Sequence, residues 1–323
     1  MTEFGYTLSS EEFGPTDLVR NAGRAEEAGF TFALISDHFH PWVDQQGQSP
    51  FVWATLGGIA EATDRLRVGT GVTCPLIRTH PAIVAHAAAT VADMMPGRFF
   101  LGLGTGENLN EHVTGSRWPA IDERLDMLEE AIEVIRALWK GELTTHRGRH
   151  YTVEQARIYT LPSDLPPIYV AAKGKRAATI AAETGDGLIA VGPHQDAAAT
   201  YRDAGGDGPR YCQLHHCWAD DEAEARRTAR KWWPNAGIGG ELSVELPLPR
   251  HYEQASETVT EDDVAKSVSC GPDPEVHLKP IRQAIRAGFD HVYLHQIGPD
   301  QEGFLRFFEE KLRPKLSTDQ SAA

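Results

Sequence analysis

Short apolar runs alternate with amphipathic stretches along the whole 323-residue chain. The runs are typical of buried strands, and patterns with a helical period separate almost all of them. The expected strands cover residues 4–8, 31–36, 66–73, 98–104, 167–172, 187–191, 209–215 and 291–295. The expected helices cover residues 15–28, 50–63, 80–94, 121–138, 175–184, 195–204, 220–233, 275–287 and 301–313.

The clearest helical period belongs to residues 121–138, whose apolar side chains recur every three or four positions. These side chains are Leu125, Leu128, Ala131, Ile132, Ile135 and Leu138. Two other segments interrupt the alternation. Residues 142–160 are predicted to form a hairpin packed over the exterior, and residues 234–260, rich in Gly, Pro and Glu, to form an excursion rather than a core element.

Strand–helix alternation that persists to the C-terminus, without a central linker, predicts a (β/α)8 barrel. We expect residues 1–323 to form this barrel as a single domain. An open, doubly wound sheet is the alternative, because periodicity does not reveal whether a sheet closes. In barrels of this kind active sites lie at the carboxyl ends of the strands. The residues directly after each strand are therefore the candidates for chemistry.

Composition narrows the class of protein. The formal charge of −15 at pH 7 argues against nucleic acid or an anionic membrane as a partner. The apolar runs are too short to cross a bilayer, and the N-terminus lacks a signal pattern. The four cysteines show no paired framework, and no set of histidines, cysteines or carboxylates has metal-ligand spacing. We expect a soluble, cytoplasmic enzyme with reduced thiols and no metal.

The densest candidate chemistry follows the second expected strand, in Ser36–Trp42 (SDHFHPW). This stretch places a carboxylate (Asp37), an imidazole (His38) and an indole (Trp42) at one rim of the sheet. Histidine is a candidate acid or base because its side chain changes protonation near neutral pH. The alternative is a strand end followed by a polar turn, and His40 is interpreted as part of such a turn.

A glycine-rich loop, Gly102–Glu107 (GLGTGE), follows the fourth expected strand. It resembles the start of a GxGxxG dinucleotide motif, but the third glycine is missing and the loop follows the wrong strand. Glycines here favour close approach of the backbone to a flat ligand, with Glu107 projecting over it. The alternative for Glu107 is a helix-capping carboxylate beside Asn108.

Together these motifs carry a family resemblance. Ser36–Trp42 and Gly104–Glu111 (GTGENLNE), with Gly185–Gly187 and Asp300-Gln301, resemble the luciferase-like superfamily of flavin and deazaflavin enzymes over nearly the whole chain. The Asp-His-Phe-x-Pro-Trp and Gly-Thr-Gly-Glu patterns match the coenzyme F420-dependent oxidoreductases grouped with F420-dependent glucose-6-phosphate dehydrogenase. The resemblance implies a barrel without a nicotinamide site. It also implies a deazaflavin across the mouth, and hydride transfer between ring C5 and an alcohol or carbonyl carbon.

The resemblance also implies roles for individual residues. His38 would be the base that removes the hydroxyl proton, and Trp42 would form a substrate wall that favours positive charge on the imidazole. Glu107 would lie by N1 of the ring and share a proton there. Asp37 would hold the cofactor, and Glu11 matches a carboxylate of the same pocket. The alternatives are a strand-end hydrogen-bonding role for His38 and ordinary core packing for Trp42.

The cofactor cradle is likewise carried over from the family. Gly71-Val72 falls where these enzymes place a strained, often cis, peptide bulge against the deazaflavin. The other positions matched to the cradle are Thr105, Gly106, Asn108, Ala171, Ala172, Gly174, Val191 and Gly192. The aliphatic residues among them are equally typical of barrel packing.

The match fails where the glucose-6-phosphate enzymes bind the sugar phosphate. Their two lysines and one arginine fall here on His194, on residues 240–246, which contain no basic residue, and on Ser267. A buried phosphate without such donors would be poorly compensated. We therefore expect a substrate other than glucose 6-phosphate, with His194 kept as a substrate-side candidate. A rearranged anion site at Arg250, His251 or Lys173 is the alternative.

Two further functions remain open at this point. An FMN-dependent monooxygenase of the same superfamily would react reduced flavin with oxygen, and a non-catalytic F420-binding protein would bind the cofactor without turnover. The resemblance also implies a homodimer, for which the apolar helices 50–63 and 80–94 are the expected interface elements.

Overall fold

The computed structural model of the chain describes residues 2–193 and 195–321. Parallel strands close into a barrel in the order β1-β2-β3-β4-β7-β8-β9-β11, and β11 pairs back onto β1. The eight-strand (β/α)8 prediction is confirmed, and the open sheet is excluded. The barrel strands are β1 (Glu3–Leu8), β2 (Phe32–Ile35), β3 (Arg67–Thr70), β4 (Phe99–Leu103), β7 (Ile168–Ala171), β8 (Gly187–Val191), β9 (Arg210–Cys217) and β11 (His291–Gln296).

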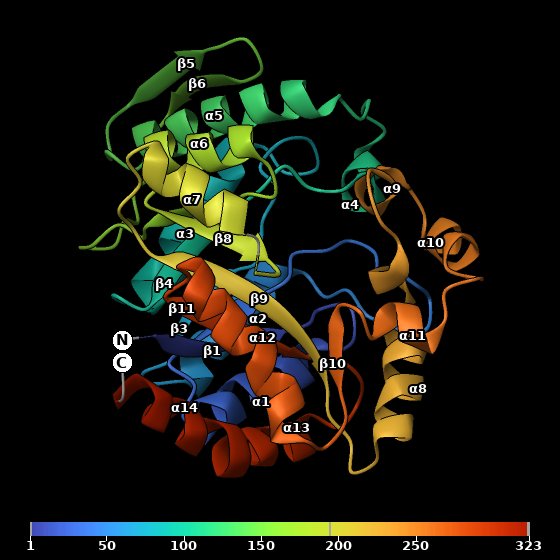
Figure 1. The fold of residues 1–323 in the computed structure, drawn as a ribbon. Coiled ribbons are helices and arrows are strands. Elements are labelled where there is room, and N and C mark those ends of the chain that lie inside the picture. The colour runs from blue at the N-terminus through green and yellow to red at the C-terminus, as the bar shows by residue number, and fades with distance from the viewer. Residues whose placement is uncertain (1, 194, 322–323) are drawn as a thin grey trace.

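Helices form the outer layer around these strands (Figure 1). They are α1 (Pro15–Ala28), α2 (Val52–Ala62), α3 (Pro81–Met94), α5 (Ile121–Leu138), α6 (Lys175–Thr184), α7 (Gln195–Asp203), α8 (Glu222–Trp232), α12 (Pro274–Ala287) and α13 (Gln301–Phe307). The last helix runs further than expected, because a π-helical turn over Phe308–Leu312 leads into α14 (Arg313–Ser321). All six apolar positions predicted for the core face of α5 are buried. No helix among the described residues is long and apolar enough to span a membrane.

Side chains that alternate along the strands fill the barrel interior. The inner cluster consists of Phe32, Leu34, Phe100, Tyr169, Ile189, Tyr211 and Tyr293. Glycines on neighbouring strands leave room for its rings: a Cβ on Gly5 would lie 2.2 Å from the Phe32 ring, and one on Gly69 would lie 2.0 Å from the Phe100 ring. The interior is therefore a packed core, and ligands have access only at its ends.

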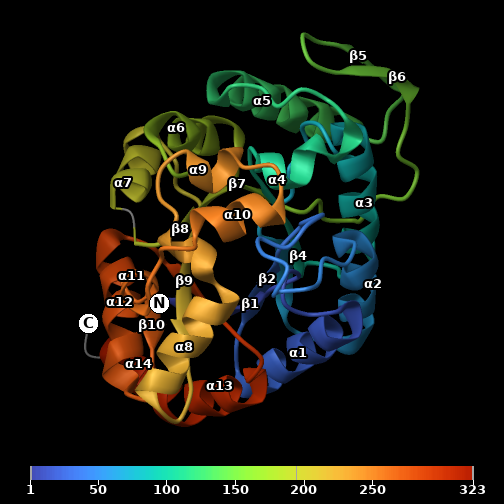
Figure 2. The same cartoon turned by 90° about the vertical axis from the view of Figure 1, so that its right-hand side faces the viewer.

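The two predicted interruptions differ in kind. Residues 142–160 form the antiparallel hairpin β5 (Thr144–Arg147) and β6 (Thr152–Ala156), which lies outside α5 in Figures 1 and 2. Residues 234–260 contain the short helices α9 (Leu242–Glu245) and α10 (Pro249–Ala255). After α11 (Glu261–Val264), a short strand β10 (Val268–Cys270) pairs with the carboxyl-terminal part of β9. Strand β10 could not be predicted from the sequence, because three residues are too few to show a period.

Close packing of the barrel wall gives a first prediction. Gly102 lies in β4, and a Cβ there would sit 2.0 Å from the carbonyl oxygen of Thr70 on the neighbouring strand. We expect Gly102→Ala to lower the free energy of unfolding by about 1–3 kcal/mol, because the backbone must shift to admit the methyl group. Urea denaturation measures the change.

Gly239→Ala is the matched control, since nothing lies within 4 Å of a Cβ built there. Equal stability of the Gly102 and Gly239 variants would contradict the packing argument.

Candidate active site

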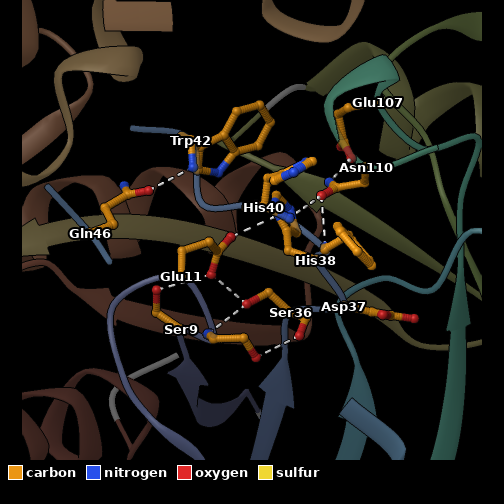
Figure 3. Close-up of polar contacts among 12 residues, drawn as sticks. Ser9, Glu11, Ser36, Asp37, His38, His40, Trp42, Gln46, Glu107 and Asn110 are labelled. Atoms are coloured by element: carbon orange, nitrogen blue, oxygen red, sulfur yellow. Dashed lines mark hydrogen bonds and ion pairs between the residues drawn. The ribbon is translucent and has the colours of Figure 1, made fainter. Parts of the chain in front are cut away.

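Loops from three different barrel strands meet at one mouth of the barrel (Figure 3). Glu11 comes from the loop after β1, His38 from the loop after β2, and Glu107 from the loop after β4. All three strands are parallel, so their carboxyl ends lie on the same rim. The closure of the sheet thus brings together residues that are far apart in the sequence.

His38 has a defined partner at each ring nitrogen. Nδ1 lies 3.1 Å from the carbonyl oxygen of His40, and Nε2 lies 3.4 Å from Oε1 of Glu11. The carbonyl and the carboxylate both only accept, so the protonated ring can donate to each of them. We assign the proton of the neutral ring to Nδ1, which makes the shorter contact, and the accepting lone pair to Nε2. The side chain is only 10% exposed. This arrangement suits a base whose protonated form has a carboxylate beside it.

Glu11 is held as a carboxylate. Its side chain is buried, and Oε2 accepts hydrogen bonds from the hydroxyls of Ser36 (2.6 Å) and Ser9 (3.1 Å). Burial by itself would raise the pKa of Glu11, but the charge of His38 and the hydrogen bond from Ser36 outweigh it, so the pKa lies below its usual value. Glu11 is therefore a counter-charge rather than a proton donor at neutral pH.

Trp42 packs beside His38. The two ring centroids are 5.1 Å apart and the planes are inclined by 61°, an edge-to-face contact. On its other side Trp42 meets Tyr252 of α10 at 5.2 Å. The backbone N–H of Trp42 donates to Oε1 of Gln46, which orders the turn. Trp42 is only partly buried, so it borders the mouth instead of filling the core.

Asn110 was missed by sequence reasoning, although it joins two walls of the mouth. Its Oδ1 accepts from the backbone N–H groups of Phe39 (2.9 Å) and His40 (3.1 Å), and its Nδ2 donates to Oε2 of Glu107 (3.3 Å). Its side chain is buried. The sequence feature that could have identified Asn110 is its position three residues after Glu107, in a Gly-Glu-x-x-Asn motif. Glu107 itself occupies the N-cap position of α4 (Asn108–Glu111) but makes no capping bond, so the helix-cap alternative is excluded.

Asp37 has internal partners for both carboxylate oxygens. Oδ1 accepts from Nη2 of Arg78 (2.9 Å) and Oδ2 from the hydroxyl of Thr73 (2.8 Å). Nε of Arg78 also lies 3.3 Å from a carboxylate oxygen of Glu111. Burial by itself would lower the pKa of Arg78, but the charges of Asp37 and Glu111 outweigh it and hold the pKa above its usual value. The buried triad Asp37–Arg78–Glu111 therefore ties the loops after β2, β3 and β4 together. Neither Arg78 nor Glu111 was singled out from the sequence.

The predicted cradle positions line the same rim. The Gly71–Val72 peptide is cis, as the resemblance implied. Ala171 packs on the inner cluster, whereas Ala172 points into the core behind the barrel and offers only its backbone. Val191 is 52% exposed at the end of β8. Thr105 is partly buried, and Gly106 and Gly192 adopt positive φ.

Three other expectations concern single side chains. The amide of Asn108 donates to the carbonyl of Glu245 (2.9 Å), so this group is already engaged within the protein. His40 belongs to the turn, where its Nδ1 lies 2.9 Å from the carbonyl oxygen of Leu109. The predicted substrate-side residue His194 lies outside the described residues.

The described residues contain no group of three or more histidines, cysteines or carboxylates that could hold a metal ion. The four cysteines are free and buried.

The buried triad gives a stability prediction. Arg78→Met removes the cation and leaves two buried carboxylates facing each other, which should cost about 3–5 kcal/mol in the free energy of unfolding. Arg147→Met is the control, because the ion pair of Arg147 with Glu154 is exposed (69% and 56%) and worth under about 1 kcal/mol. Denaturant unfolding of both variants tests this, and similar losses would argue against a special role for the triad.

The chain is similar to known proteins over almost its whole length. The family model described as luciferase-like monooxygenase matches residues 1–291. The chain is 38% identical over 322 residues to an F420-dependent hydroxymycolic acid dehydrogenase of Mycobacterium tuberculosis, covering 97% of this chain and 88% of that protein. It is 35% identical over 329 residues to an F420-dependent glucose-6-phosphate dehydrogenase of Segniliparus rotundus, covering 97% and 98%.

A solved structure agrees with these relatives. An F420-dependent secondary alcohol dehydrogenase in complex with an F420-acetone adduct superposes with a TM-score of 0.89 and 31% identity, covering 96% of this chain and 97% of that one. The family model spans most of the chain, and the relatives match almost all of it above 30% identity. The chain belongs to the luciferase-like monooxygenase family.

Proposed function

We propose that the protein is a coenzyme F420-dependent oxidoreductase that interconverts an alcohol and a carbonyl compound. The observation that carries this proposal is the His38–Glu11 pair, an imidazole with a free Nε2 beside a buried carboxylate at the barrel mouth. Such a pair serves a reaction in which a hydroxyl loses its proton. The family relatives named above are F420-dependent dehydrogenases.

The rim fits a flat, phosphate-bearing cofactor. A Cβ on Gly104 would lie 2.6 Å from Val72, so only glycine leaves the loop this close to the Gly71–Val72 bulge. Exposed Val191 offers an apolar contact. Gly174 precedes α6 with no side-chain cap and with nothing within 4 Å of a Cβ there, so the first N–H groups of α6 are open to a phosphate oxygen. Exposed Lys173 adds positive charge.

When bound, the deazaflavin supplies the hydride acceptor or donor at C5. In the direction of oxidation, His38 Nε2 takes the hydroxyl proton as hydride leaves the carbinol carbon. Glu11 stabilises the resulting imidazolium from 3.4 Å, and the His40 carbonyl keeps the ring in its orientation. Trp42 forms the wall on the substrate side. In the reverse direction the imidazolium of His38 returns the proton to the carbonyl oxygen, by microscopic reversibility.

Glu107 has a different role from Glu11. It is partly buried, and Asn110 orients its carboxylate. With the deazaflavin bound, Glu107 would lie on the side of N1, where its carboxyl group would stabilise the negative charge of the reduced ring. Asp37 holds the cofactor side of the mouth through the loops it ties together, rather than through a free oxygen.

Glucose 6-phosphate is disfavoured as the substrate. Ser267, at the position matched to the arginine, is exposed and its hydroxyl donates to the carbonyl of Val264. In residues 240–246 the charged side chains are Glu241 and Glu245. A phosphate dianion bound near either carboxylate would be destabilised by repulsion between the negative charges.

We further propose a single-domain, cytoplasmic homodimer. Phe51 beside α2, and Ile83 and Met94 on α3, are large apolar side chains that are 62%, 59% and 42% exposed. They lie on or next to the helices 50–63 and 80–94, which are the interface elements expected from the family resemblance.

Binding and turnover of the purified chain test the function. We expect oxidised F420 to bind, with quenched fluorescence, and an alcohol to bleach its absorbance. His38→Ala should lower kcat/KM by about 10²–10⁴-fold while F420 binding is retained, because only the base is lost.

His40→Ala is the matched control from the same turn and should change kcat/KM by less than about tenfold. Preferential FMN binding with oxygen consumption would support the monooxygenase instead, and tight F420 binding without any turnover would support a carrier protein.

Glu11 gives a prediction on catalysis. Its pKa lies below the usual value, so the carboxylate is charged at neutral pH and stabilises the imidazolium that forms on His38. Glu11→Gln removes this counter-charge and should lower kcat at neutral pH about tenfold, which corresponds to about 1.4 kcal/mol. Ser9→Ala, which removes only a hydrogen bond to Glu11, should lower kcat less. An unchanged kcat in Glu11→Gln would refute the role.

A further inference from the structure

Residues 238–252, which we call the wall segment, lie beside the catalytic loop although about 200 residues separate them in the sequence. The segment includes α9 and most of α10, and α9 lies next to α4 in Figures 1 and 2. Its apolar side chains form one cluster with the residues that follow His38. The members are Trp42, Val43, Leu109, Ile238, Leu246 and Tyr252.

Glu245 fastens the wall segment to the opposite side of the mouth. Its Oε2 accepts from Nε1 of Trp118 (2.9 Å), and Oε1 lies 3.2 Å from Nη1 of Arg124 on α5. Its backbone carbonyl accepts from Nδ2 of Asn108 (2.9 Å), the neighbour of Glu107. We call these four residues the Glu245 clasp.

The burial of Arg124 makes its ion pair with Glu245 contribute more free energy than an exposed pair would. Exposed ion pairs contribute little, and the Glu245 side chain is 43% exposed. Arg124, however, is only 2% exposed, and its guanidinium lies 4.0 Å over the Trp118 ring. Without Glu245, the buried cation would keep the carbonyl of Pro119 (2.8 Å) but no carboxylate among the described residues. Because an uncompensated buried charge is costly in free energy, separation of Glu245 from Arg124 is unfavourable and the wall segment is held in place.

We propose that Glu245 is a positioning residue that determines substrate specificity. Through the clasp it fixes the wall segment so that Leu246 and Tyr252 pack against Trp42 and form an apolar wall beside His38. This wall selects uncharged, apolar alcohols and ketones. The proposal rests on the proposed function, whose substrate class it defines.

The charges around the wall agree with this class. The charged side chains of the wall segment are the carboxylates Glu241 and Glu245 and one arginine, Arg250, which is exposed. Arg78 and Arg124, which lie near the mouth, are already paired with carboxylates. A phosphate ester would meet negative charge, whereas an alkyl chain would be removed from water against the apolar cluster.

The test compares Glu245→Gln with Glu241→Gln. Both substitutions remove one negative charge from the wall segment, but the exposed Glu241 carboxylate takes no part in the clasp. Steady-state kinetics would use F420 with 2-propanol, 2-octanol and glucose 6-phosphate. F420 affinity would be measured separately by fluorescence.

We expect the unaltered chain to prefer 2-octanol over 2-propanol and not to oxidise glucose 6-phosphate. Glu245→Gln should raise KM for 2-octanol about tenfold or more, with kcat, the 2-propanol KM and the F420 Kd changed less than about threefold. Glu241→Gln should change none of these values. The specificity role would be overturned by an equal rise in KM for both alcohols, by weakened F420 binding, or by no effect of Glu245→Gln.

Hydrogen exchange provides a readout that does not depend on turnover. In the cofactor-free chain, Glu245→Gln should speed exchange of amides in the wall segment, such as Val244 and His251, and leave the strands unchanged. Unchanged exchange would show that Glu245 does not fix the segment.

The two readouts separate this proposal from the function on which it rests. If the unaltered chain neither binds F420 nor oxidises an alcohol, the proposed function fails and the specificity role fails with it. Faster exchange would then still show that the clasp holds the segment. If the unaltered chain oxidises alcohols but the variant shows neither effect, only the clasp proposal fails.

Discussion

The pairing of β1 with both β2 and β11 is the constraint on which the rest of the molecule depends. It closes a sheet of parallel strands, and a closed parallel sheet has all its carboxyl ends on one rim. Loops that begin after Leu8, Ile35, Thr70 and Leu103 are thereby brought within hydrogen-bonding distance of one another. The packed interior, filled by rings that fit over Gly5 and Gly69, confines chemistry to this rim.

Two groups of polar side chains at the rim have different roles, one structural and one chemical. The triad Asp37–Arg78–Glu111 is buried and internally satisfied, so it fixes the loops without facing a ligand. The pair His38–Glu11 is also shielded, but one nitrogen of the imidazole keeps an accepting lone pair. The first grouping gives rigidity and the second gives reactivity. Asn110 joins the backbone after His38 to Glu107 and precedes Glu111 of the triad in the chain.

In the proposed function, the wall segment sets the substrate and the barrel rim carries the chemistry. The chain is similar over almost its whole length to proteins named for different substrates: glucose 6-phosphate, hydroxymycolic acid and a secondary alcohol. The segment that contains Glu245 belongs to an excursion from the barrel, so its residues can differ while the rim keeps its geometry. Here the excursion brings carboxylates and aliphatic side chains to the mouth.

The fold class and the stretch Ser36–Trp42 could be predicted from the sequence alone, because strand and helix periods and local motifs are properties of neighbouring residues. The sequence also led to the expectation of a substrate other than glucose 6-phosphate, since basic residues expected from the family resemblance are missing from it. It did not reveal Arg78, Asn110 or Glu245, or the short strand β10. Their partners are distant in the sequence, and nothing local distinguishes a buried, bridging arginine from one on a surface. Only the closed barrel decided that Asp37 faces inward to Arg78. Only the folded excursion decided that Glu245 faces Arg124, because such pairings depend on which loops the tertiary structure brings together.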